Sequence, residues 1–536
     1  MPWRPIMMAS GDGGGRAPVV ILTEQSNVTS GIEVQEKLVS AALALGNIIR
    51  STFGPRGLDK MLYKSDGNTA VTNDGAKIIS ELLVKHPAAK ALVSLGHSQE
   101  STCGDGVTGC LLLATELMRE AGRLLKKGLH PLIIIEGWRQ ALKITLDVIA
   151  GSKSSINPVN ISAVAATSLV GKGAEGALDT LSSLVVSATL EVAASLPEDT
   201  SVMAELILMN KAKRGSMHDS RLVKGVILEK RLANDKIPRN LESVPVVLLT
   251  CPLEFEGPTR DSEIEITDPQ QLTAFIDAGE KFLDEICEQI LSTGAKAVFT
   301  TGGVDPRVLH SLSERGVFVL SDLDQIELKN LSGATGAEMV DLLRSLTIDD
   351  LGEAGVIHVE RREGVEDIED RITIDICPEP TIVTIEVGGA NDLATEEVIR
   401  GLYDSLKATT LALRDGYVVN GGGHIHCSSA LAIRGMAEGS AGRERLAMES
   451  FARALETIPF TLASNAGKEG LDTVLELRAT LRNEPQSVVG IMSNGEVGEV
   501  PEVLIPAESL ISAITGAFET ASSLLRVDQV ISVRGD

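Results

Sequence analysis

The chain has 536 residues, of which 43% are apolar and 23% are charged. This length predicts about three domains at roughly 100–200 residues each, with cores large enough to need no disulfides or metals. The formal net charge of −25 and the aromatic content of 3% argue against nucleic acid and anionic membranes as partners. An acidic surface repels phosphate groups, and few aromatic side chains are available to stack on bases.

The six cysteines follow no Cys-x-x-Cys spacing and are mostly far apart, which is typical of reduced thiols in a cytoplasmic protein. A run of about 18 apolar residues, as a transmembrane helix needs, is absent from the sequence. Residues 1–18 contain no apolar stretch of the kind found in secretory signals, so we expect a disordered tail there. These features predict a cytoplasmic protein without a membrane partner.

Apolar residues recur at helical spacing near both ends of the chain. On the N-terminal side this pattern predicts helices over 32–50, 108–125 and 131–150. On the C-terminal side it predicts helices over 394–414, 424–438, 444–463 and 508–525. The two ends of the chain are therefore alike in being rich in helix.

The middle of the chain has a different pattern. Short apolar runs at 246–250 and 297–300 predict buried strands, and they alternate with helices such as 270–291. This alternation favours a mostly parallel sheet. The simplest arrangement is a helical domain built from both ends, with an α/β domain inserted between them. The chain would then cross between the two domains near 160–228 and again near 380–412.

A Walker-type phosphate loop is absent, because Gly171-Lys172 and Gly467-Lys468 lack the upstream Gly and the following Ser or Thr. Glycine-containing clusters offer another cradle for phosphate, and they lie at 52–57, 72–75, 104–109 and 421–423. Glycine lets backbone N–H groups approach a phosphate, and a helix N-terminus adds a favourable dipole. An Asp in such a loop can hold Mg²⁺. Each cluster taken alone, however, is more simply an ordinary turn.

Taken together and in this order, the clusters resemble the group II chaperonins, the family of the archaeal thermosome and the eukaryotic cytosolic chaperonin. The resemblance covers about residues 20–533 and is nearest to a thermosome subunit. The segments that carry it are STFGPRGLDKML (51–62), AVTNDGAKII (70–79), CGDGVTG (103–109), TSLVGKGAE (167–175), VVLLTCPLEFE (246–256), LGEAG (351–355), LYDSL (402–406), VVNGGG (418–423) and IPFTLASNAG (458–467).

The resemblance implies a multidomain chaperonin fold with α and α/β parts. A helical equatorial domain would comprise 1–160 and 415–536, and a hinge-like intermediate domain would comprise 161–228 and 381–414. Residues 229–380 would form an inserted α/β apical domain that binds substrate. Its helical protrusion would begin at Asp268 and Pro269 and act as a built-in lid. A separate lid protein would then be unnecessary.

The resemblance also implies an ATPase that uses ATP and Mg²⁺. Asp105 would bind the metal, Asp404 would position the attacking water, and Asp74 would assist it. The residues that would contact the nucleotide are Thr52, Gly54, Pro55, Gly75, Gly106, Val107, Thr108, Gly109, Lys172, Gly422 and Gly423. The alternative interpretation of Asp404 is a solvated carboxylate on a helix.

The sequence departs from the family at several of these positions. Val107 and Gly109 replace the first and third Thr of Gly-Asp-Gly-Thr-Thr-Thr, and Tyr403 replaces a His before the hinge Asp. Ile505 stands where the family has an acidic residue that contacts the ribose. These departures put nucleotide affinity in question.

Three functions follow as hypotheses. The first is an ATP-hydrolysing subunit of a double ring of identical or homologous chains, which encloses and folds non-native proteins. The second is a chaperonin-like ring subunit that binds substrate with weak or absent ATPase activity. The third, and weakest, is a monomeric small-molecule kinase that uses the glycine-rich loops.

Overall fold

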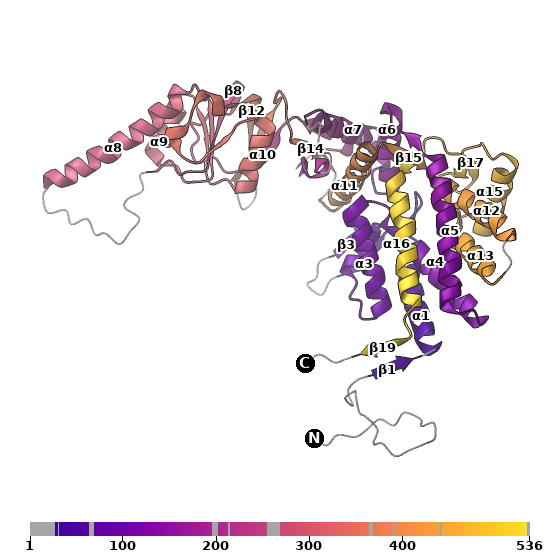
Figure 1. Cartoon of the computed structure of the whole chain (residues 1–536). Helices are drawn as coiled ribbons and strands as arrows, with labels where there is room; N and C mark the ends of the chain where they lie inside the picture. The colour runs from indigo at the N-terminus through magenta and orange to yellow at the C-terminus, as the bar shows by residue number, and fades with distance from the viewer. Residues whose placement is uncertain are drawn as a thin grey trace, which may run out of the picture. The chain divides into compact units, whose positions relative to one another are not determined.

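Figure 1 presents the fold as a computed structural model. The structure describes residues 27–30, 32–63, 69–195, 202–212, 215–254, 269–363, 368–389, 392–439 and 442–532. The expectations for the tail 1–18 and for Asp268 lie outside these residues. The chain divides into two compact units, a terminal unit (Met1–Glu175 and Leu411–Asp536) and a middle unit (Gly176–Thr410).

The terminal unit is mainly helical. Its helices are α1 (Ile32–Arg50), α2 (Gly75–Glu81), α3 (Pro87–Cys103), α4 (Val107–Lys126), α5 (Pro131–Ser152), α6 (Pro158–Leu169), α12 (His424–Glu438), α13 (Glu444–Leu455), α14 (Thr457–Asn465), α15 (Gly470–Asn483) and α16 (Ala507–Leu525). Helix α11 (Asp392–Asp415) crosses the division between the units. The sequence-predicted helices are confirmed, except that the one expected over 444–463 is two helices. The break falls before Pro459, which occupies the first turn of α14. An N–H group in the first turn has no partner within the helix, so proline is tolerated there.

Helix α4 is the centre of this unit. It contacts α1, α3, α5, α13, α14 and α16, and the side chains from Cys110 to Leu113 are almost completely buried. A helix that is apolar on nearly all sides is stable only when other helices surround it. The apolar run VTGCLLLATELM therefore explains why α4 lies at the centre of the terminal unit.

Short strands tie distant parts of the terminal unit together. The antiparallel pair β1 (Asn27–Ser30) and β19 (Gln529–Ser532) joins the two ends of the described chain, as Figure 1 shows. Strands β2 (Lys60–Tyr63) and β3 (Thr69–Thr72) form an antiparallel pair, as do β16 (Val489–Ile491) and β17 (Val497–Glu499). Strand β15 (Tyr417–Asn420) lies between β18 (Leu504–Pro506) and β4 (Ser154–Ser155).

The middle unit contains a seven-stranded sheet. Its order is β10 (Phe318–Leu320), β9 (Ala297–Thr300), β8 (Asn240–Leu249), β12 (Gly352–Glu363), β13 (Ile368–Asp375) and β7 (Val226–Lys230), and β11 (Met339–Val340) also pairs with β8. The strands from β8 to β11 are parallel, but β12, β13 and β7 pair antiparallel. The expectation of a mostly parallel sheet is therefore wrong, because the sheet is mixed. In β12, buried Ile357 and Val359 alternate with exposed His358 and Glu360, which is typical of antiparallel strands and forms no apolar run.

Helices cover this sheet. The helix expected over 270–291 is α8 (Pro269–Ser292), and its Leu283, Ile286 and Ile290 are buried against strand residues such as Val298. The other helices of the sheet are α9 (Pro306–Glu314) and α10 (Gln325–Thr335). A second sheet has β14 (Val383–Val387) between β5 (Ile207–Lys211) and β6 (Arg221–Val223).

Helix α7 (Leu178–Ser195) packs on β14. Among the described residues it is the one helix that is long and apolar enough, by length and composition, to cross a membrane. Asp179 and Glu191 interrupt the apolar sequence of this helix. Its buried residues Leu181, Val185, Ala188 and Val192 lie on one face, which is the pattern of an amphipathic helix that covers a sheet.

Glu456 joins four helices of the terminal unit. It lies between α13 and α14 and is 5% exposed. Arg434 of α12 donates to both of its carboxylate oxygens, at 2.5 and 2.6 Å, and Arg478 of α15 also donates to both. Two bidentate guanidinium groups offset the lost hydration of one buried carboxylate.

We predict that Glu456→Ala destabilises the terminal unit by about 3–5 kcal/mol, because it leaves two arginines without their buried counter-charge. Differential scanning calorimetry would show this as a lower unfolding temperature. Glu449→Ala is the matched control, since Glu449 makes one surface pair with Arg445 at 2.9 Å, and it should change stability by no more than about 0.5 kcal/mol. Equal effects of the two variants would contradict this role of Glu456.

Candidate nucleotide site

A tight turn joins α3 to α4 and presents Asp105. Gly104 ends α3 with φ 70°, and Gly106 precedes α4 with φ 85°. Both angles lie in the left-handed region that side chains disfavour. Because Gly106 has no side chain to cap α4, the first N–H groups of that helix are available to a ligand. Asp105, Gly106, Thr108 and Gly109 are all half-buried, so this helix start is accessible.

The carboxylate of Asp105 has three partners. The Gly106 N–H donates to Oδ1 at 2.8 Å, and the Ser168 hydroxyl donates to Oδ2 at 2.8 Å. Lys172 Nζ lies 3.4 Å from Oδ1. A third of the Asp105 side chain remains exposed, so the carboxylate is both oriented and open on one side.

Asp74 is the N-cap of α2. Its carboxylate accepts from the Ala76 N–H at 2.9 Å and from the Lys77 N–H at 3.2 Å. This cap stabilises the helix by about 0.5–2 kcal/mol. Sequence reasoning gave Asp74 only a catalytic part, whereas the structure also gives it a capping role, which Asp74→Ala would remove.

The predicted loops lie together in the terminal unit. Gly75 packs against the Thr108 side chain with no room for a Cβ atom between them, so clusters 72–75 and 104–109 are neighbours. The side-chain amide of Asn73 donates to the Gly171 carbonyl oxygen. A Cβ atom on Gly171 would lie 3.0 Å from the Gly54 carbonyl oxygen, so the turn that carries Lys172 also contacts cluster 52–57.

Cluster 52–57 is fixed on both sides. The Thr52 hydroxyl donates to the Ile49 carbonyl oxygen at 2.8 Å, and Thr52 is 5% exposed, so this hydroxyl closes the end of α1. Pro55 lies beside Gly171. Arg56 Nε donates to the Ser493 carbonyl oxygen at 3.3 Å, which connects the cluster to the segment after β16.

Cluster 421–423 joins β15 to α12. Gly422 and Gly423 have φ angles of 59° and 76°. The Gly422 carbonyl oxygen accepts from the Ile491 N–H at 2.7 Å, and Gly421 N–H donates to Val503 at 2.7 Å. The cluster therefore belongs to the same unit as the other loops and packs against β16.

Asp404 belongs to the middle unit, on α11, and is 7% exposed. The interpretation of Asp404 as a solvated surface carboxylate is therefore wrong, because the side chain is buried. Its assignment to hydrolysis stays a prediction.

The departures from the family have structural explanations. Val107 is 4% exposed and belongs to the main core of the terminal unit. At this position only the backbone N–H could donate a hydrogen bond to a phosphate. Gly109 lies beside the Phe53 ring, which a Cβ atom would contact at 3.4 Å. Ile505 pairs with Val419 across β18 and β15.

The residues around Asp105 fit a magnesium ion that binds together with a nucleotide. Among the residues that the structure describes, no group of three or more His, Cys, Asp or Glu side chains could hold a metal. Asp105 offers one carboxylate, and Mg²⁺ commonly binds one or two carboxylates together with phosphates and water. Burial raises the pKa of Cys110 to about 12, so this thiol is neutral at pH 7 and is no metal ligand.

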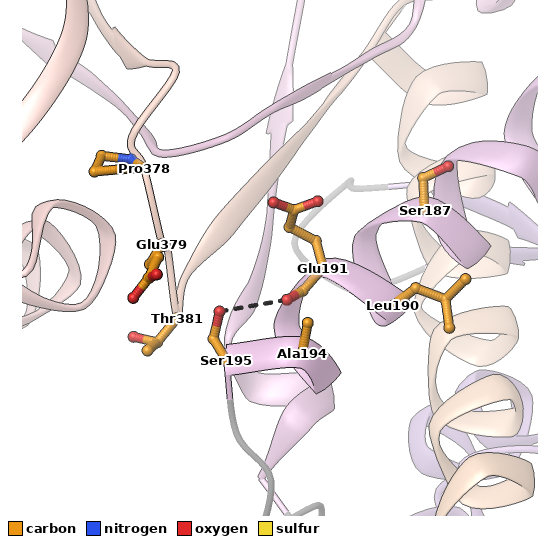
Figure 2. Close-up of a pocket in the computed structure, with 8 residues that line it drawn as sticks. All are labelled: Ser187, Leu190, Glu191, Ala194, Ser195, Pro378, Glu379 and Thr381. Carbon is orange, nitrogen blue, oxygen red and sulfur yellow. Dashed lines mark hydrogen bonds between the residues drawn. The ribbon is translucent and has the colours of Figure 1, made fainter.

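A cavity of about 710 Å³ lies elsewhere, in the middle unit between α7 and residues 378–381. Figure 2 shows Glu191 and Ser195 on α7 facing Glu379 and Thr381. Glu191 is paired with Lys224 at 2.7 Å. The lining of the cavity includes the acidic side chains Glu191 and Glu379, and acidic groups repel phosphate. The loops of the terminal unit are therefore the better candidate for a nucleotide site.

Comparison with known proteins identifies the family. The family model of the TCP-1/cpn60 chaperonin family matches residues 45–534.

The chain belongs to the TCP-1/cpn60 chaperonin family.

Relatives of this chaperonin include a thermosome subunit of Methanocaldococcus jannaschii, 36% identical over 97% of this chain and 96% of the relative. A thermosome subunit of Methanopyrus kandleri is also 36% identical, over 98% and 96%. The thermosome subunit alpha of Archaeoglobus fulgidus is 36% identical over 97% and 95%. The resemblance and the multidomain chaperonin fold are confirmed, and a chaperone function follows from the family. The comparison gives no support to the kinase hypothesis.

Sequence reasoning missed three residues of this site: Ser168, Asn73 and Gln99. Gln99 Nε2 donates to the Asp105 carbonyl oxygen at 3.0 Å. Ser168 and Asn73 lie inside the segments TSLVGKGAE and AVTNDGAKII, so their place was visible in the sequence, but their partners were not.

Proposed function

We propose that this chaperonin is an ATP-driven ring subunit whose Mg-ATP site is the turn 104–109 with its neighbouring loops. The observation that carries the proposal is the oriented, partly exposed Asp105 carboxylate at the uncapped start of α4. A carboxylate beside free helix N–H groups suits a metal-bound phosphate, because the metal contacts the carboxylate and the phosphate oxygens contact the N–H groups.

Each residue has a distinct part in this proposal. Asp105 would hold Mg²⁺, which when bound neutralises charge on the phosphate oxygens. The backbone N–H groups of Thr108 and Gly109 would donate to phosphate. Lys172, with its ammonium 3.4 Å from Asp105, supplies a cation at the same place. Asp404 would position the attacking water, and Asp74 would hold the start of α2 beside Thr108.

Assembly into a double ring of identical or homologous subunits is part of the proposal. The relatives are named thermosome subunits. The hairpin of β2 and β3 exposes Met61 at 73% and Tyr63 at 78%, and Leu58 before it is 70% exposed. Large exposed apolar side chains gathered on one hairpin favour contact with another subunit.

Within such a ring, the middle unit would bind non-native proteins in the cytoplasm, and α8 would belong to a built-in lid. ATP hydrolysis would drive closure of this lid over the chamber, so no separate lid protein would be needed. Burial of Val107 supports the alternative of weak or absent ATPase activity, because the Thr hydroxyl usual in the family is replaced by a core side chain. Phosphate release from the purified ring distinguishes the two.

Ring assembly is tested by the mass of the purified protein. We expect a particle many times heavier than one chain in light scattering. The double variant Met61→Asp with Tyr63→Asp should yield lighter particles, because charge replaces apolar contact area. A monomeric wild-type protein at micromolar concentration would rule out the ring.

Asp105→Ala should weaken Mg²⁺-dependent ATP binding by about 100-fold or more. Loss of a direct ligand exceeds the roughly 10- to 100-fold effect of an outer partner of a metal site. Isothermal titration calorimetry measures this. Asp59→Ala, which removes an exposed carboxylate after cluster 52–57, is the control and should bind as the wild type does. Unchanged affinity of the Asp105 variant would refute the metal assignment.

Asp404→Ala should bind ATP with nearly wild-type affinity but turn it over about 10²-fold more slowly, as expected when a positioned catalytic group is lost. The measurement is steady-state phosphate release beside equilibrium ATP binding. Asp392→Ala, at an exposed position of the same helix, serves as control with normal turnover. Full ATPase activity of the Asp404 variant would overturn the mechanism but not the fold.

A further inference from the structure

Ser168 makes an unusual contact for a serine in a helix. It lies in the last turn of α6, is 6% exposed, and donates to Asp105 Oδ2 at 2.8 Å. Many hydroxyls in the described helices donate to a carbonyl oxygen three or four residues earlier, as Ser162 does to Pro158 at 3.3 Å and Thr189 to Val185 at 2.7 Å. Ser168 donates instead to a carboxylate 63 residues away.

Helix α6 is held in place independently of this bond. Asn157 caps its start by accepting from the Val159 and Asn160 N–H groups at 3.0 and 2.9 Å. At its other end, the Thr167 hydroxyl oxygen accepts from the Leu504 N–H at 3.2 Å. The Ser168 hydroxyl is therefore presented to Asp105 by a fixed element and restrains the rotation of the carboxylate.

The two oxygens of Asp105 have different surroundings. Oδ1 has the Gly106 N–H at 2.8 Å and the Lys172 ammonium at 3.4 Å. Oδ2 has the neutral, buried Ser168 hydroxyl. Because both oxygens accept a hydrogen bond, the plane of the carboxylate is fixed, and a third of the side chain remains exposed.

We propose that Ser168 is a positioning residue for the metal-binding carboxylate of this chaperonin, an inference that rests on the proposed Mg-ATP site. Ser168 acts through Asp105 and does not itself touch the metal. An outer partner that orients a ligating carboxylate typically changes metal affinity or activity by about 10- to 100-fold. Its loss should therefore appear in the Mg²⁺ dependence of nucleotide binding and not in nucleotide binding without metal.

The test is ATP binding to the full-length protein, titrated with Mg²⁺ and repeated in EDTA. Ser168→Ala should raise the half-saturating Mg²⁺ concentration by about 10- to 100-fold and leave ATP affinity in EDTA unchanged. Ser162→Ala, at an exposed position of the same helix, should change neither. Ser168→Thr keeps the hydroxyl and should restore the wild-type Mg²⁺ dependence. Ser168→Cys keeps the size with a weak donor and should fall between them.

Thermal unfolding of each variant without metal separates positioning from folding. If Ser168→Ala melts early, Ser168→Cys supplies the comparison at nearly constant volume. A wild-type Mg²⁺ dependence in both variants would overturn the role of Ser168 while leaving the Mg-ATP site intact. Equal loss of ATP affinity with and without Mg²⁺ would also overturn it, because that pattern indicates general disruption. Failure of the wild type to bind Mg-ATP would instead remove the proposed function itself.

Discussion

Two hydrogen bonds to the carbonyl oxygen of Asp105 connect the site to the rest of the terminal unit. Gln99 Nε2 donates to it at 3.0 Å and Ser509 Oγ at 3.3 Å, while Ser512 Oγ donates to the side-chain oxygen Oε1 of Gln99 at 2.9 Å. Gln99 is 2% exposed, and an unsatisfied polar group at such a position costs about 1–3 kcal/mol. These bonds join α3, α16 and the turn at the start of α4. The shape of the turn and the association of the two chain ends therefore stabilise each other.

This arrangement explains how an accessible loop can be rigid. The turn needs two left-handed glycines, which lose more conformational entropy on folding than other residues. Buried bonds from Gln99 and Ser509 hold its backbone, and the Gly106 N–H and Ser168 hold its side chain. Because both the backbone of the turn and the carboxylate are held, the carboxylate is preorganised for a cation. Part of the entropy cost of ordering the carboxylate on binding is thereby removed. Val107 is the exception in this arrangement, because a buried core side chain stands where the family usually has the hydroxyl of a Thr.

Charge is distributed differently in the two units. In the terminal unit, buried acids such as Glu120 and Glu456 are paired with arginines, so they stabilise helix junctions and are not free to act on a ligand. Asp105 differs because its partner is a lysine at the longer distance of 3.4 Å and its side chain remains partly exposed. In the middle unit, the cavity beside α7 supplies acidic side chains, and its lining residues include no glycine. These contrasts favour the turn 104–109 over the cavity as the proposed nucleotide site.

The sequence by itself determined what depends on neighbouring residues. Helical periodicity predicted α1, α4, α5 and α12, and the glycine clusters predicted the turns, because helix and turn preferences are local. Tertiary structure alone decided which distant residues meet: Ser168 with Asp105, Gln99 with Ser509, and β12 with β13. It also gave Asp74 its cap and buried Asp404. Such contacts depend on how whole helices and strands pack, and no short window of sequence contains the two partners that must be brought together.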